Sequence, residues 1–110
     1  MDFTATETKR CQLVHVSGFV DSSVAPEFQH QLEALLAAGH NRLVVNLAGV
    51  TFLSSAGIRA LVGALSACRK AHGDLRLSEM SEPVARVLEL TSVDMHFKRF
   101  GSDAEAVGSF

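Results

Sequence analysis

Hydrophobic residues in the first half of the chain form two short runs that are typical of β-strands. Residues 11–17, Cys-Gln-Leu-Val-His-Val-Ser, are predicted to be a strand, which we expect to end at Gly18. Residues 43–47, Leu-Val-Val-Asn-Leu, are almost continuously apolar. Such a run indicates a central strand covered on both faces, and we expect Gly49 to make the turn that follows it.

Two longer segments repeat apolar residues at the spacing of an amphipathic helix. The first follows Asp21 and Ser22, with Ser23 expected as the N-cap, Pro26 as the third helical residue and Gly39 as the stop. Its apolar stripe consists of Phe28, Leu32, Leu35 and Leu36. The second helix is expected from about Ser55 to Ala71, with a stripe of Ile58, Leu61, Val62, Leu65 and Cys68.

The other elements have weaker signals. Residues 3–9, 75–77 and 95–100 are predicted to be strands, and the tail from Gly101 is expected to be a fraying helix. Ser81-Glu82-Pro83 predicts the start of a third helix, because it offers a cap, an acid and an early proline. The alternation of strands and helices predicts an α/β fold with a mostly parallel or mixed sheet and crossover helices.

The composition fits one compact domain spanning residues 1–110, since 47% of the residues are hydrophobic. The formal net charge is -2 and the basic residues are scattered, so we expect no nucleic-acid partner. The N-terminus shows no apolar leader, and no apolar run approaches the ~20 residues that span a bilayer. We therefore expect a cytoplasmic protein without membrane insertion, in which Cys11 and Cys68 are small core residues.

The sequence indicates no metal and no cofactor. The five histidines are not spaced from one another, or from a cysteine, as metal ligands usually are. The glycines are isolated, so neither the Walker loop nor the GxGxxG loop occurs. The chain is therefore not expected to be a kinase or a nucleotide hydrolase.

Residues 53–57, Leu-Ser-Ser-Ala-Gly, lie between a strand and a helix, where a serine can carry chemistry. A hydrolase elbow, GxSxG, needs a small residue where this chain has Leu53, so a serine hydrolase acting through Ser55 is the least favoured hypothesis and no enzyme activity is expected. The structural interpretation is simpler: Ser54 caps the helix, Ser55 is its first residue, and Gly57 permits a close backbone approach.

The segment 53–57 belongs to a longer pattern. Residues 50–61, Val-Thr-Phe-Leu-Ser-Ser-Ala-Gly-Ile-Arg-Ala-Leu, resemble the signature of STAS domains, the family of bacterial anti-sigma factor antagonists. Residues 16–21, 43–47 and 83–91 resemble three further family segments in the right order. The resemblance covers about residues 11–100. It implies the STAS fold, a four- to five-stranded mixed β-sheet with α-helices packed largely on one face.

The resemblance also implies a function and a site. In this family the second serine of the signature is the phosphoacceptor, which corresponds to Ser55. The implied partner is an anti-sigma factor serine kinase of the GHKL ATPase class that also sequesters a sigma factor. The unphosphorylated antagonist would bind this kinase and release the sigma factor, phosphorylation would break the complex, and a phosphatase would reset it.

Three positions depart from the family pattern. Ser54 stands where well-known members often have Asp, which removes a negative charge but leaves a comparable N-cap. Ala56 stands where Ser or Thr is frequent, which leaves Ser55 as the better acceptor. Phe19 replaces an acid and is expected to expose apolar surface near the interface, where it would affect partner choice.

The expected partner surface combines two strand-to-helix loops, because such loops gather at one end of a sheet with crossovers. Its residues are Asp21, Ser22, Ser54, Ser55, Ala56, Gly57 and Arg59. The alternative function is that of a STAS accessory subunit of a lipid or solute transporter, which would never be phosphorylated.

Overall fold

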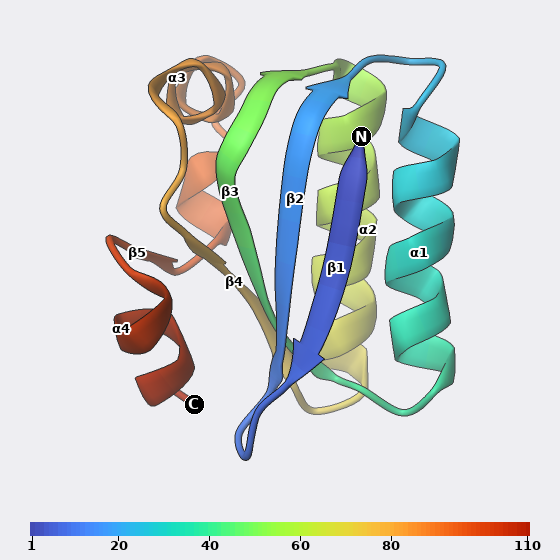
Figure 1. Ribbon diagram of the computed structural model, residues 1–110, viewed down its shortest axis with the longest axis vertical. Helices are drawn as coiled ribbons and strands as arrows, with labels where there is room; N and C mark the ends of the chain where they lie inside the picture. Colours follow the sequence, from blue (N-terminus) through green and yellow to red (C-terminus); the bar gives the residue numbers. More distant parts are fainter.

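A five-stranded mixed sheet forms the centre of the molecule, in a computed structural model that describes residues 1–110 (Figure 1). The strand order is β1-β2-β3-β4-β5, in which β1 is antiparallel to β2 and all other neighbours are parallel. The strands are β1 Asp2–Glu7, β2 Gln12–Val20, β3 Arg42–Leu53, β4 Asp74–Ser78 and β5 Arg99–Phe100. The predicted α/β fold with a mixed sheet is confirmed.

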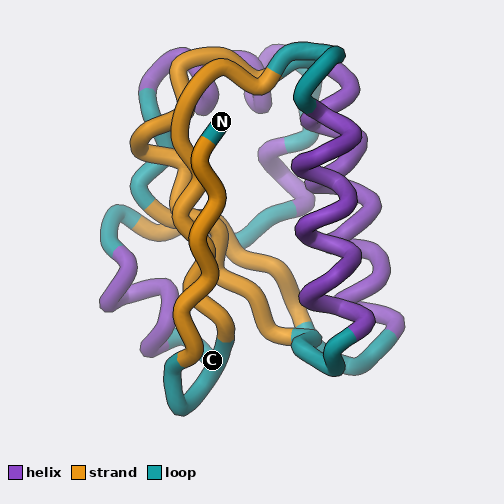
Figure 2. The backbone as a smooth tube through the Cα atoms, turned by 45° about the vertical axis from the view of Figure 1, so that its right-hand side comes forward, coloured by secondary structure: helices purple, strands orange, loops and turns teal.

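Four helices surround the sheet: α1 Ala25–Ala37, α2 Ser55–Lys70, α3 Glu82–Leu90 and α4 Asp103–Gly108. The two long helices, α1 and α2, lie next to each other on one side of the sheet (Figure 2). Buried residues of α3 join the same core, whereas α4 packs on the opposite face through Ala106 against Cys11 and Val44. The helices therefore lie largely on one face, with α4 as the exception. None of them is long and apolar enough to cross a bilayer.

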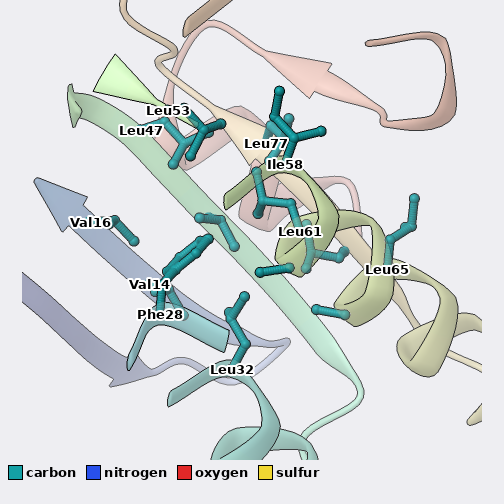
Figure 3. Close-up of a cluster of buried hydrophobic side chains, with 14 of the residues drawn as sticks. Val14, Val16, Phe28, Leu32, Leu47, Leu53, Ile58, Leu61, Leu65 and Leu77 are labelled. Atoms are coloured by element: carbon teal, nitrogen blue, oxygen red, sulfur yellow. The ribbon is translucent and has the colours of Figure 1, made fainter. Parts of the chain in front are cut away.

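The main core lies between the sheet and helices α1 and α2 (Figure 3). Phe28 and Leu32 from α1 and Leu61 from α2 are essentially inaccessible to solvent and pack on strand residues such as Val14. These helical residues belong to the stripes that the sequence predicts, because residues three or four positions apart share one face of a helix. Cys11 and Cys68 are both buried, as expected for small core residues.

Strands β2 and β3 extend further than the sequence predicts. Gly18 does not end β2, and Gly49 makes no turn but lies inside β3 opposite Ser17. The register between the two strands shifts here, and a Cβ on Gly49 would lie 2.6 Å from the Cβ of Ser17. Gly49 is therefore required by the close approach of two strands at an irregularity, which a single sequence does not distinguish from a turn.

The C-terminal region also differs in detail from the prediction. Instead of one strand over 95–100, a short 3-10 helix at Asp94–His96 precedes the two-residue strand β5. The tail after Gly101 does form a helix, α4, whose first turn is capped by Ser102. Because α4 covers part of the second sheet face, the tail is a packed element of the domain.

Candidate functional site

The carboxyl ends of β2 and β3 bring the two predicted loops together. The strands are parallel, and Val20 is the register partner of Leu53. The N–H of Ser54 donates a hydrogen bond of 2.8 Å to the carbonyl oxygen of Val20. Asp21 and Ser54, the residues that follow these strands, are therefore neighbours in space, as the sequence predicts.

Ser54 and Ser55 occupy different positions at the start of α2. Ser54 has an extended backbone, and its hydroxyl accepts a hydrogen bond of 3.2 Å from the N–H of Gly57. Ser54 is thus the N-cap, as predicted. Ser55 is the first helical residue, and its side chain is exposed and has no hydrogen-bond partner in the protein. The hydroxyl of Ser55 is free to react or to contact another molecule.

The first turn of α2 is held close to the strand ends. Gly57 is buried, and a Cβ at this position would lie 2.7 Å from Cδ1 of Leu53 and 3.2 Å from Cγ1 of Val20. The absence of a side chain therefore allows the helix to begin directly above both strands. Ala56 is half-buried, and Arg59, one turn further along, is exposed.

The loop between β2 and α1 is organised by Asp21. Its Oδ1 accepts hydrogen bonds from the hydroxyl of Ser23 at 2.7 Å, the N–H of Ser23 at 3.0 Å and the N–H of Val24 at 3.1 Å. These bonds stabilise the carboxylate, so the pKa of Asp21 is lowered, chiefly by the Ser23 hydroxyl. Ser22 is exposed at the tip of this turn.

The predicted N-cap of α1 is wrong. The helix begins at Ala25 after Val24, which makes no side-chain cap, and Pro26 occupies one of the first two helical positions rather than the third. The Ser23 hydroxyl donates to Asp21 instead of accepting from the helix. The Asx-type turn at Asp21 uses the Ser23 hydroxyl as a donor, so this hydroxyl does not cap the helix, and the N-cap position falls on Val24, one residue later.

A second aromatic residue lies beside Phe19 near the ends of β2 and β3. The ring of Phe19 stacks on Phe52 of the neighbouring strand, with centroids 4.5 Å apart and an angle of 17° between the ring planes. Phe19 is exposed, as the sequence predicts, and Phe52 is exposed beside it, which the sequence does not predict. The parallel register that pairs Phe19 with Phe52 is the missing information, since the two residues are 33 positions apart in sequence.

The start of α2 is electrostatically favourable for a negative charge. The first N–H groups of a helix lack intrahelical acceptors, and the positive end of the helix dipole lies beside them. No group of three or more His, Cys, Asp or Glu side chains is arranged to hold a metal ion.

A mixed sheet whose longest strand leads into a serine-capped helix is the arrangement of a STAS domain. The family model for the STAS domain matches residues 2–106, and the chain belongs to this family.

Relatives and solved structures agree with that assignment. The chain is 28% identical over 103 residues to an anti-sigma-B factor antagonist of Staphylococcus aureus, covering 93% of this chain and 94% of the relative. An anti-sigma factor antagonist from Mycobacterium paratuberculosis has a TM-score of 0.88 at 24% identity, covering 98% and 92% of the two chains. The Bacillus cell fate determinant SpoIIAA in its phosphorylated form has a TM-score of 0.75 at 14% identity, covering 98% of each chain. The last two similarities establish the fold.

Proposed function

We propose that this protein is a phospho-switched antagonist of an anti-sigma factor, with Ser55 as the phosphorylation site. In its unphosphorylated form it binds an anti-sigma factor serine kinase of the GHKL class and thereby releases a sigma factor. Phosphorylation of Ser55 ends the binding, and a phosphatase restores it. The relatives of this chain are anti-sigma factor antagonists, which supports the partner class.

One observation carries the proposal: the unpartnered hydroxyl of Ser55 at the first position of α2. The capping bond is made by Ser54, so modification of Ser55 removes no hydrogen bond of the fold. A phosphoryl group adds about −1.5 to −2 charges at pH 7. At this end of a helix such a charge is stabilising, so the phosphorylated protein stays folded.

The switch then acts on the interface rather than on stability. The surface that we propose for the kinase consists of Asp21, Ser22, Ser54, Ser55, Ala56, Gly57 and Arg59, all in the two adjoining loops or the first turns of α2. A phosphate that must lose water against a partner shaped for a hydroxyl costs several kcal/mol. A loss of ~4 kcal/mol would weaken binding about a thousandfold. Because Ser54 is uncharged, the contrast between the two forms depends mainly on the phosphate.

Titration of each form against the anti-sigma factor kinase, with ADP present, tests the proposal. Ser55→Ala is expected to bind as tightly as the unmodified protein. The phosphorylated protein is expected to bind about a thousandfold more weakly, and Ser55→Glu to bind weakly while melting near the wild-type temperature. Ser66→Glu is the matched control, because Ser66 is exposed on the same helix but lies three turns from its start.

Equal affinity of the phosphorylated and unmodified proteins would contradict the switch and favour the transporter-type STAS module. In the complex, backbone amide shifts should concentrate at Asp21, Ser22 and residues 54–59. Shifts confined to residues 81–100 would place the interface elsewhere.

A further inference from the structure

Two aromatic rings are exposed at the carboxyl end of the sheet. Phe19 of β2 and Phe52 of β3 are 56% and 40% exposed, although they stack on each other. The other exposed large hydrophobic residues, Leu90 and Met95, are not part of an aromatic stack. Because the rings stack, they form one continuous exposed apolar area rather than two singly exposed residues.

We propose that the Phe19–Phe52 pair is the apolar anchor of the interface with the anti-sigma factor, which covers the two rings with an apolar side chain of its own. This inference rests on the proposed function, because it assigns a second part of the same binding surface. Aromatic residues are enriched in the energetically important centres of protein interfaces, since they bury much area with few rotatable bonds.

The aromatic pair is continuous with the phosphorylation site. Phe19 and Phe52 lie one residue before Val20 and Leu53, respectively. Val20 and Leu53 are the last residues of the two strands that lead into the site loops. Phe52 lies three positions before Ser55, a path of roughly 10 Å at strand spacing. A partner surface of about 800 Å² spans both features. One partner bound over Ser55 therefore also reaches the rings.

Charges near the pair favour a different protein over a second copy of this chain. A hollow of about 410 Å³ includes Ser17 and Gly49, which lie two and three positions before the rings in β2 and β3, and is lined by the carboxylates of Asp2, Glu79 and Asp103 and by His15, which pairs with Asp103. In a symmetric dimer each surface meets its own copy. The acidic hollows would then approach each other, whereas a partner with basic groups around an apolar centre would complement them.

The test is a titration of unphosphorylated variants against the anti-sigma factor kinase with ADP present. Phe19→Thr and Phe52→Thr keep strand-forming residues but remove the rings, and each is expected to weaken binding about 30-fold. Leu90→Ala and Met95→Ala remove exposed apolar side chains elsewhere and are expected to change affinity less than twofold. Phe19→Leu keeps most of the apolar area and is expected to retain most of the affinity, which separates loss of contact from loss of fold.

The outcomes distinguish this inference from the switch. Wild-type affinity in the Phe19→Thr/Phe52→Thr double variant, together with weak binding of Ser55→Glu, would overturn the aromatic anchor and leave the switch intact. No binding of the wild-type chain to any anti-sigma factor kinase would overturn both. If sedimentation showed that the wild type self-associates and the double variant is a monomer that still binds the kinase, the rings would be a contact between copies, contrary to the proposal.

Discussion

Helices α2 and α4 both begin after a serine whose hydroxyl accepts a hydrogen bond of 3.2 Å from the N–H three residues later, from Gly57 to Ser54 and from Glu105 to Ser102. In each helix the next residue is polar and occupies the first helical position, Ser55 in α2 and Asp103 in α4. The local structure is the same, yet the two side chains have opposite environments.

The difference lies in what the sheet offers to each side chain. The Asp103 carboxylate accepts hydrogen bonds from Ser78 Oγ at 2.6 Å and Asn46 Nδ2 at 2.9 Å, and lies 2.9 Å from Nε2 of His15. It thereby links α4 to three strands. Ser55 sits beyond the strand ends and faces solvent. Residues with the same local geometry thus gain or lack structural contacts according to their tertiary surroundings, and a side chain without structural partners can be modified without loss of the fold.

Replacement of Asp103 should give the largest effect on stability. Asp103→Ala removes the acceptor from Asn46 and from the fully buried Ser78, so both lose a charge-assisted hydrogen bond. We expect the free energy of unfolding to fall by about 3 kcal/mol, since unsatisfied buried groups cost 1–3 kcal/mol each and the site is partly exposed. Urea denaturation of the two proteins measures this difference.

The same carboxylate should make stability depend on pH. Although partial burial raises the pKa of Asp103, hydrogen bonds from Ser78, Asn46 and His15 together lower it below the ordinary value of 3.8. The unfolded state therefore takes up the proton first, so the stabilisation is complete above pH 3.8 and is lost as the pH falls through the lower pKa of the folded state. Asp103→Asn should flatten this acid slope. An unchanged slope would mean that other carboxylates determine it.

How far the sequence predicts these features depends on how local they are. Ser54 as cap and Ser55 as first helical residue follow from a short run, and the helix stripes follow from periodicity, so both were predicted correctly. The roles of Gly49 and Phe52 depend on strand register, and that of Asp103 depends on contacts with residues 25 to 88 positions away. No single-sequence pattern encodes such pairings, so the sequence predicts a turn at Gly49 where the structure has an irregularity in strand pairing, and it gives no signal for Phe52 or Asp103.

Substitution of the two N-cap serines, Ser54 of α2 and Ser102 of α4, is the next test of the comparison between the two helix starts. Ser54→Ala should lower the free energy of unfolding by about 1 kcal/mol, and Ser54→Asp should largely preserve it, because Asp is a comparable N-cap. Ser102→Ala should instead accelerate hydrogen exchange mainly within the six residues of α4, since a short terminal helix opens locally. If Ser54→Ala left stability unchanged and abolished phosphorylation of a folded protein, the roles assigned to Ser54 and Ser55 would be reversed.

Substitution of Ser55 has the smallest expected effect on stability, and it probes the role of the Ser55 hydroxyl directly. Its hydroxyl is exposed and makes no hydrogen bond, and alanine has a slightly higher helix propensity than serine. Ser55→Ala should therefore change the free energy of unfolding by less than about 0.5 kcal/mol, in either direction. Ser55→Asp should stabilise the protein by roughly 0.3–1 kcal/mol at low salt, because a negative charge at the first turn interacts favourably with the helix dipole, and added salt should reduce this gain. Urea denaturation at two salt concentrations measures both changes. A loss above 1 kcal/mol in Ser55→Ala would show that the hydroxyl supports the fold as Asp103 does, and the contrast between the two helix starts would then disappear.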